Sequence, residues 1–133
     1  MARIRAVLDT NVLVSGWLFG GNPRIILELA LNGQIEGTTS PQLLSELSDV
    51  LLKKFSFSTA RVRAVESKLK SRFKVVRPKS SITILRDIAD NRVLEAAVAG
   101  SCHFIITGDK ELLALKKFRK ILIIPPEDFL KKE

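Results

Sequence analysis

The chain has 133 residues, 46% of them hydrophobic and 27% charged, which is the composition of one globular domain with its own core. A single cysteine, Cys102, excludes an internal disulfide framework and a four-thiolate zinc site, and only His103 is available for histidine chemistry. The N-terminus has no secretory signal pattern, and no run of about 18 apolar residues is long enough to span a membrane. We therefore expect residues 1–133 to form a single cytoplasmic domain.

The net charge of +8 is unevenly distributed along the chain. Residues 53–79 contain ten Lys and Arg but one acid, Glu66, and a second basic group lies within residues 110–120. Basic patches attract polyanions, nucleic acid above all, yet solvated helix faces have the same composition. Charge alone therefore favours neither explanation.

Short apolar runs alternate with amphipathic segments. Strands are predicted for the apolar runs at residues 4–8, 35–39, 73–76, 104–107 and 121–124. Helices are predicted where apolar residues recur every three or four positions, at residues 23–31, 41–51, 58–72, 90–99, 110–115 and 126–130. Two of these helices are expected to begin at a cap followed by proline, Asn22–Pro23 and Ser40–Pro41. Alternating strands and helices predict an α/β fold with a mostly parallel sheet covered on both faces.

Four acidic residues are predicted to lie at one edge of this sheet. Asp9 ends the first strand, Asp109 lies just past the strand at 104–107, Asp90 begins a helix, and Glu46 lies in the second turn of the helix after the second strand. Function in such sheets usually lies at the carboxyl ends of the strands. Because carboxylates repel one another, their convergence indicates a bound cation, and oxygen ligands without His or Cys suit Mg²⁺ or Mn²⁺.

Each acid also has a structural explanation. Asp90 and Asp109 precede helices that they could cap, and Glu46 could belong to a solvated helix face. Asp9 differs, because a carboxylate directly after a buried strand is costly unless it is paired, hydrogen-bonded or bound to metal. The residues therefore favour a functional role for Asp9, and a structural role for the other three when each is taken singly.

Three segments of the chain resemble the motifs of the PIN-domain nucleases, in the order of that family. They are Val7–Val14 (VLDTNVLV), Asp90–Gly100 (DNRVLEAAVAG) and Ile105–Leu113 (IITGDKELL). The last two resemble one branch, relatives of the VapC-like ribonucleases that act as toxin components of toxin–antitoxin pairs. The resemblance spans nearly the whole chain.

The resemblance implies a three-layer α/β/α sandwich that cleaves RNA with Mg²⁺ or Mn²⁺, an antitoxin partner and a homodimer. The family's four acids correspond here to Asp9, Glu46, Asp90 and Asp109. Supporting roles are implied for Thr10 or Asn11, which would order the first loop, and for Thr107, which would contact the metal and its water. The branch often has a denser acidic run where this chain has Asp87-Ile88-Ala89-Asp90, which makes Asp87 a candidate auxiliary ligand.

Phosphodiester hydrolysis of this kind needs no histidine base. Two metal ions about 4 Å apart can activate water, neutralise the developing charge and support the leaving alkoxide. Lys and Arg side chains would bind the RNA backbone on either side of the cleaved phosphate. The candidates for this role are Arg61, Arg63, Lys68, Lys110 and Lys116.

Three other functions are compatible with parts of this pattern. A haloacid-dehalogenase-type phosphatase also has an Asp after its first strand, which serves as nucleophile, but it has a second acid where this chain has Asn11. A receiver domain has paired acids near its first strand that are absent here. The more serious alternative is a PIN fold with a decayed site that binds RNA or a partner without cutting. The four acids argue against decay, and Mn²⁺ binding would separate the two.

Overall fold

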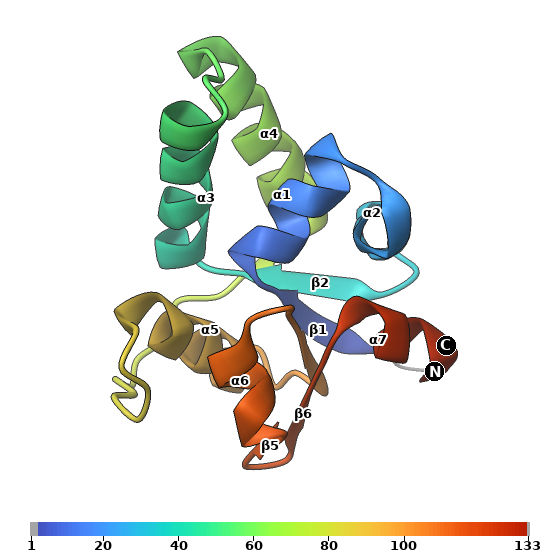
Figure 1. The fold of residues 1–133 in the computed structure, drawn as a ribbon, viewed down its shortest axis with the longest axis vertical. Helices are drawn as coiled ribbons and strands as arrows, with labels where there is room; N and C mark the ends of the chain where they lie inside the picture. The colour runs from blue at the N-terminus through green and yellow to red at the C-terminus, as the bar shows by residue number, and fades with distance from the viewer. Residues whose placement is uncertain (1–2, 133) are drawn as a thin grey trace.

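The computed structural model describes residues 3–132, which form one six-stranded sheet and seven helices (Figure 1). The strands are β1 (Arg5–Leu8), β2 (Glu36–Thr39), β3 (Lys74–Val75), β4 (Phe104–Ile106), β5 (Lys117–Phe118) and β6 (Ile121–Ile124). The helices are α1 (Thr10–Leu18), α2 (Gly21–Leu31), α3 (Pro41–Lys54), α4 (Thr59–Arg72), α5 (Ile88–Ala99), α6 (Lys110–Leu115) and α7 (Pro126–Lys132).

The sheet is parallel except at one edge. Its strand order is β3-β2-β1-β4-β6-β5, and only the β5–β6 pair is antiparallel among the described strands. The central strand β1 aligns Val7 with Thr38 of β2 on one side and with Ile105 of β4 on the other. The predicted α/β class with a mostly parallel sheet is confirmed.

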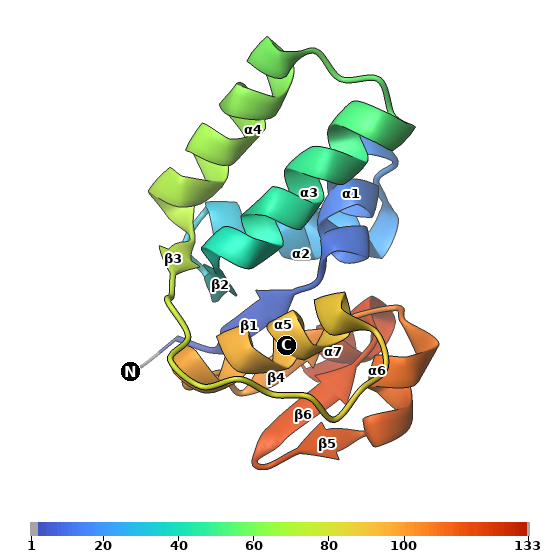
Figure 2. The ribbon, with the colours of Figure 1, turned by 90° about the vertical axis from the view of Figure 1, so that its left-hand side faces the viewer.

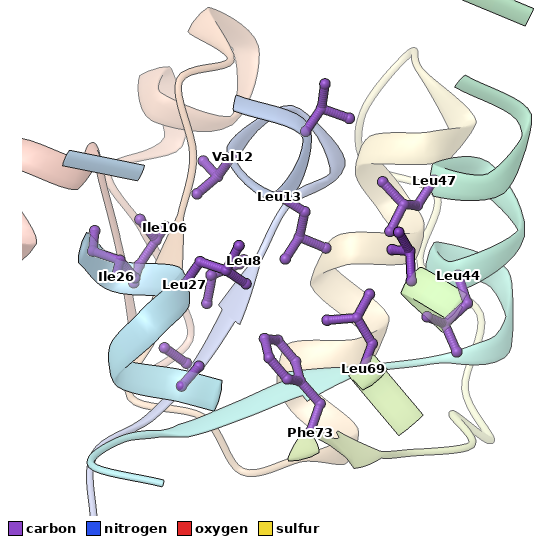
Figure 3. Close-up of a cluster of buried hydrophobic side chains, with 14 of the residues drawn as sticks. Leu8, Val12, Leu13, Ile26, Leu27, Leu44, Leu47, Leu69, Phe73 and Ile106 are labelled. Atoms are coloured by element: carbon purple, nitrogen blue, oxygen red, sulfur yellow. The ribbon is translucent and has the colours of Figure 1, made fainter. Parts of the chain in front are cut away.

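Alternation along the strands sends side chains into two separate cores. Leu8 and Ile106 belong to the core that the sheet forms with α1, α2, α3, α4 and α7 (Figure 3). Their chain neighbours Val7 and Ile105 point to the opposite face, where they pack with residues of α5 and α6. Figures 1 and 2 show the sheet between these two helical layers, which makes the fold the expected three-layer sandwich.

Helix α1 was not predicted from the sequence. Its segment is an apolar run with no polar stripe, and Val12, Leu13 and Val14 are all buried. The helix begins directly after β1, with Asp9 as its N-cap. Because α1 follows β1 without an intervening loop, the first turn of the helix lies at the carboxyl edge of the sheet.

Several element boundaries differ from the prediction. Helix α2 begins at Gly21, so Asn22 is not its cap; Gly20 and Gly21 have positive φ angles of 89° and 68° and supply the turn after α1. Helix α5 begins at Ile88 rather than at Asp90. The predicted strand 73–76 is shortened to β3, since Phe73 is the C-cap of α4 and does not belong to the strand. The Phe73 ring packs so closely on Gly37 that a Cβ atom added to Gly37 would lie 2.6 Å from the ring.

Within residues 3–132, no helix combines the length and the apolar character needed to cross a membrane.

Candidate functional site

Asp9 is a buried carboxylate at the carboxyl end of the central strand. Its side chain is 5% exposed, and its Oδ1 atom accepts a hydrogen bond of 3.0 Å from the backbone N–H of Val12, in the first turn of α1. Burial raises the pKa of Asp9 to about 6, the charges of Asp109 and Glu46 add to this rise, and the hydrogen bonds from Thr107 and Val12 oppose it. The folded chain therefore holds this carboxylate in an environment that disfavours its charge.

Thr107 connects the ends of two adjacent strands. Its hydroxyl donates a hydrogen bond to Oδ2 of Asp9 and accepts one of 3.0 Å from the backbone N–H of Asp109. Thr107 follows β4 and is fully buried, so this hydroxyl has no access to solvent. The contact fixes the position of Asp9 relative to the β4–α6 segment.

Asp90 lies in the first turn of α5 and is 8% exposed. Its Oδ2 atom is buried and has no hydrogen-bond partner among the described residues. Burial raises the pKa of Asp90 to about 7, with further contributions from the charges of Asp109, Asp87, Glu111 and Asp9. An unpartnered, buried carboxylate oxygen surrounded by other acids is a strong candidate ligand for a cation.

The other two aspartates at this edge are helix N-caps. Oδ1 of Asp109 accepts hydrogen bonds from the backbone N–H groups of Glu111 and Leu112, at 2.9 and 3.1 Å, in the first turn of α6. Oδ1 of Asp87 accepts one of 2.9 Å from Ala89 at the start of α5. The capping explanation therefore holds for Asp109, and at α5 it applies to Asp87 instead of Asp90. Each cap engages one carboxylate oxygen, which leaves the second available to another ligand.

These acids line an open depression of about 700 Å³ between the first turns of α5 and α6. Its walls are formed by Asn11, Arg86, Asp87, Asp90, Gly108, Asp109, Lys110 and Glu111. We call the four acids of this depression, Asp87, Asp90, Asp109 and Glu111, together with the buried Asp9 beside them, the acidic cluster. Three separate segments of the chain therefore meet here, as the rule for parallel sheets predicts.

Glu46 reaches the same region from α3. Its Oε1 atom accepts a hydrogen bond from the hydroxyl of Thr10, the first residue of α1, and its charge contributes to the raised pKa of Asp9. Glu46 does not line the depression; it lies beside a smaller hollow of about 300 Å³ between α3 and α5. No group of three or more His, Cys, Asp or Glu side chains within residues 3–132 is close enough to hold a metal ion.

A family model described as the PIN domain matches residues 5–111, which is most of the chain. The chain belongs to the PIN domain family. It is also 31% identical over 127 residues to MJ1680, a protein of Methanocaldococcus jannaschii named as uncharacterized, and this match covers 92% of the chain and 81% of that relative.

Two solved structures have the same fold as this PIN domain. The structure of VapBC2 from Rickettsia felis bound to a promoter DNA fragment matches with a TM-score of 0.62 and 16% identity, over 90% of this chain and 97% of the other. The PIN domain endonuclease Utp24 matches with a TM-score of 0.50 and 22% identity, over 90% of this chain and 82% of the other. At these identities the likeness establishes the fold.

The basic residues singled out in the sequence are spread over this PIN domain. Lys110 lines the depression of the acidic cluster. Arg61, Arg63 and Lys68 are exposed on α4, which packs against α3 and α2, and Lys116 is the C-cap of α6 at the end opposite Asp109. Lys110 is thus the one member of the five that lines the depression itself.

Sequence reasoning missed two charged residues of the depression, Arg86 and Glu111. Glu111 follows Asp109 closely and could have been found from its place in the first turn of α6. Arg86 lies in the irregular segment before α5, where no periodic pattern marks it. Its position depends on side chains of α5 that bind this segment, which only the structure reveals.

Proposed function

We propose that this PIN domain is a metal-dependent endoribonuclease that hydrolyses RNA phosphodiester bonds with Mg²⁺ or Mn²⁺. The observation that carries the proposal is Oδ2 of Asp90, which is buried and unpartnered among the described residues, in a depression that Asp109 also lines and near enough to Asp9 for their charges to interact. A PIN domain that had lost its chemistry would have no need to keep these mutually repelling groups together.

The donor set fits a hard divalent cation. Asp9, Asp90 and Asp109, with Glu46 nearby on α3, offer carboxylate oxygens, and no thiolate or imidazole lines the depression. Asn11 and Asp87 add oxygen donors at its wall. When bound, the metal supplies an activated water and neutralises charge on the phosphate.

The protein's own residues prepare this site. Thr107 holds Asp9 in place through its hydroxyl, and Thr10 does the same for Glu46. Asp9 and Asp90, whose pKa values of about 6 and about 7 disfavour ionisation, become easier to ionise beside a positive charge. Lys110, which lines the depression, would attract the phosphate backbone, while Arg61, Arg63, Lys68 and Lys116 would act at longer range along the strand.

We further propose that the protein is a homodimeric, cytoplasmic toxin component whose activity is held in check by an antitoxin. Two findings support this part of the proposal: the motifs at Asp90–Gly100 and Ile105–Leu113 resemble the toxin branch, and the fold matches the VapBC2 structure from Rickettsia felis. Co-purification with the product of a neighbouring gene, and loss of RNA cleavage in that complex, would test the partner. Sedimentation of the purified chain would test the dimer.

The nuclease proposal is tested by cleavage of end-labelled single-stranded RNA. We expect cutting with Mg²⁺ or Mn²⁺, none with EDTA, and a loss of at least about 100-fold in Asp9→Asn, which keeps the size of the side chain but removes the charge. Asp128→Asn on α7, an exposed acid outside the acidic cluster, is the matched control and should cut like the parent. If Asp9→Asn cuts as well as the parent, or if the parent neither cuts RNA nor binds Mn²⁺, the proposal is wrong. Mn²⁺ binding without cleavage would indicate a restrained enzyme, and no binding a decayed site.

A further inference from the structure

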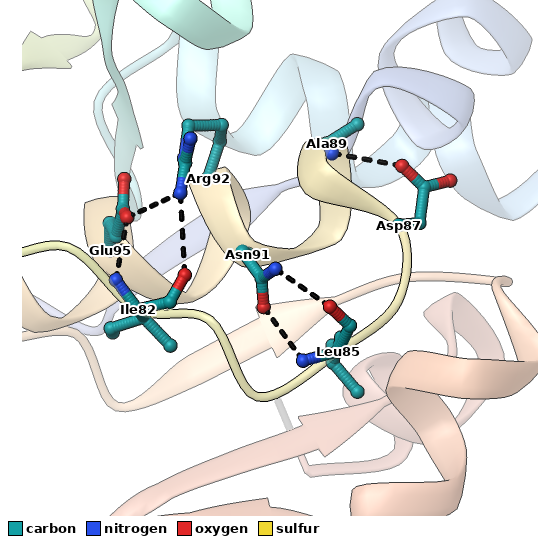
Figure 4. Close-up of polar contacts among 7 residues, drawn as sticks. All are labelled: Ile82, Leu85, Asp87, Ala89, Asn91, Arg92 and Glu95. Carbon is teal, nitrogen blue, oxygen red and sulfur yellow. Dashed lines mark hydrogen bonds and ion pairs between the residues drawn. The ribbon is translucent and has the colours of Figure 1, made fainter.

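The segment before α5 is fastened to that helix at two points. Residues 77–87 contain no regular element and run along α5 to its first turn (Figure 2). Near the middle of the segment, the backbone N–H of Ile82 donates a hydrogen bond of 2.8 Å to Oε2 of Glu95 (Figure 4). The guanidinium of Arg92 donates one of 2.7 Å to the same carboxylate oxygen and one of 3.3 Å to the carbonyl of Ile82. Glu95 is 7% exposed, so this ion pair is largely shielded from solvent.

The second fastening point lies next to the acidic cluster. The side-chain amide of Asn91 accepts a hydrogen bond from the N–H of Leu85 and donates one to its carbonyl, both at 2.9 Å (Figure 4). Asn91 is 3% exposed, so these bonds have little competition from water. One buried side chain thus fixes both polar groups of a single backbone residue.

Arg86 lies between two fixed neighbours. Leu85 before it is bound by Asn91, and Asp87 after it caps α5 through the N–H of Ala89. The Arg86 side chain is exposed and lines the depression of the acidic cluster. Among the described residues it forms no ion pair within 4.0 Å, although Asp87, Asp90, Asp109 and Glu111 line the same depression.

An exposed guanidinium that lines an acidic depression without an ion-pair partner is suited to bind an anion from outside. The carboxylates of the wall repel a phosphodiester strand, so a cation at the rim is needed to bring the strand close. Arg presents two parallel N–H donors that match two phosphate oxygens, which Lys110 on α6 cannot do. The fixed backbone on both sides of Arg86 limits the ordering that such binding would require.

We propose that Arg86 binds a phosphate group of the RNA strand next to the one that is cut, and that Asn91 is the residue that positions it. This inference rests on the proposed nuclease function. It adds to that function a substrate-binding residue outside the family motifs quoted above, and a role for a buried amide that touches no substrate.

The test begins with Arg86→Gln, which removes the charge from an exposed side chain and should leave the fold intact. Lys131→Gln on α7 is the matched control, an exposed cation whose only described ion pair, with Asp128, is 4.0 Å long. We expect Arg86→Gln to lower kcat/KM for single-stranded RNA about 10-fold or more, the range for loss of a hydrogen bond to a charged group, and Lys131→Gln to leave it unchanged. Equal values for the two variants would overturn the proposal.

A neutral phosphate then separates contact from general electrostatics. In a series of RNA strands, one phosphate that is not cut is replaced by a neutral methylphosphonate, at a different position in each strand. The nucleotide at that position carries a 2′-O-methyl group, which prevents self-cleavage. Strands with the 2′-O-methyl group and a normal phosphate are the reference. If Arg86 binds one phosphate, the loss caused by Arg86→Gln disappears on the strand where that phosphate is neutral and persists on the others. A loss of the same size on every strand would mean that Arg86 acts only as a diffuse charge, and the proposal would be wrong.

The same strands test the positioning role of Asn91. Asn91→Ala, or the milder Asn91→Ser if the alanine variant does not fold, should cleave normal RNA more slowly than the parent. On the strand where Arg86→Gln no longer causes a loss, the Asn91 variant should cleave at the same rate as the parent. A purely structural defect would lower cleavage equally on all strands and would remove Asn91 from the proposal.

Binding measurements keep this inference distinct from the nuclease proposal. The anisotropy of labelled RNA is measured in the Asp9→Asn background, where the strand stays intact. The phosphate contact is supported if Arg86→Gln weakens binding of normal RNA but does not weaken binding of one strand that carries a methylphosphonate. This holds even if the parent cuts no RNA. Unchanged binding on every strand refutes the contact even if the parent is an active nuclease.

Discussion

The hydroxyl of Thr107 donates a hydrogen bond to the carboxylate of Asp9 and so joins the ends of β4 and β1 next to the acidic cluster. The same hydroxyl oxygen accepts the backbone N–H of Asp109, so one buried side chain links two of the acids from which we expect a metal site. A hydroxyl can do this because it is donor and acceptor at once. A side chain of similar shape without that oxygen would leave both partners unsatisfied.

The first prediction concerns Thr107→Val, which keeps the shape of the side chain and removes the hydroxyl. The variant should unfold with a free energy lower by about 1–3 kcal/mol at neutral pH, because Asp9 and the N–H of Asp109 both lose a buried partner. It should also raise the pKa of Asp9 further, since the bond from Thr107 lowers it. Urea denaturation and carboxyl NMR titration measure the two effects. Thr107→Ser keeps the hydroxyl and is the control; equal loss in both variants would show that the methyl group matters instead.

The second prediction concerns pH. Asp9 and Asp90 have pKa values of about 6 and about 7 in the folded chain, against an ordinary value of 3.8. The folded state therefore binds protons more tightly than the unfolded state, and stability falls as pH rises from about 4 to about 7. The ionised form of Asp9 costs the folded protein as much as about 3 kcal/mol above this window and nothing below it.

The pH effect is checked by denaturation of the metal-free protein across this range. Asp9→Asn and Asp90→Asn should each be more stable than the parent at pH 7.5 and should show a flatter dependence on pH, because the amide never ionises. Asp128→Asn should follow the parent curve. A parent whose stability rises steadily from pH 4 to pH 7 would contradict the raised pKa values.

The location of the acids could be predicted from the sequence because it depends on topology. Once strands 4–8 and 104–107 are parallel neighbours, Asp9 and Asp109 must lie at the same sheet edge. Helix α1 could not be predicted because its apolar residues face neighbours on several sides and leave no periodic signal. Arg86 was missed for a related reason, since an irregular segment is positioned by its partners on α5 and carries no pattern of its own.

Asn91 and Glu95 illustrate a second limit of sequence reasoning. Polar residues on a helix are ordinarily assigned to its solvated face, yet both are buried here because each satisfies backbone groups of the segment before α5. The same ambiguity applied to Asp109, which could be a cap or a ligand. The structure shows that it is a cap through one oxygen, and this leaves its second oxygen free for the ligand role that we propose.

The third prediction concerns metal binding by the acidic cluster. Mg²⁺ or Mn²⁺ should raise the melting temperature of the parent, because a cation that binds only the folded state stabilises it by about 2.7 kcal/mol at a hundred times its Kd. The increase should be largest above pH 7, where Asp9 and Asp90 are both ionised. EDTA should reverse it. Asp90→Asn should lose most of the increase and Asp128→Asn none; an equal increase in all three proteins would place the metal elsewhere.

The fourth prediction concerns the packing of α1 on α2, on which the position of Asp9 depends. Replacing glycine by alanine inside a helix ordinarily stabilises it by about 1 kcal/mol. At Gly16 of α1 the sign should reverse, because a Cβ atom there would lie 2.9 Å from the carbonyl oxygen of Pro23 and 3.3 Å from the backbone nitrogen of Arg24. These are backbone atoms of α2, so the helices must separate, at a cost of about 1–3 kcal/mol.

Thermal or urea denaturation of Gly16→Ala measures this loss. Gly108→Ala is the control, since a Cβ atom at Gly108 would meet nothing within 4 Å and should leave stability equal or slightly higher. Because Asp9 caps α1, a displacement of that helix also moves the carboxylate away from Thr107. Gly16→Ala should therefore cleave RNA more slowly than the parent at a temperature where both are folded, and a destabilised variant with parental activity would show that the site tolerates movement of α1.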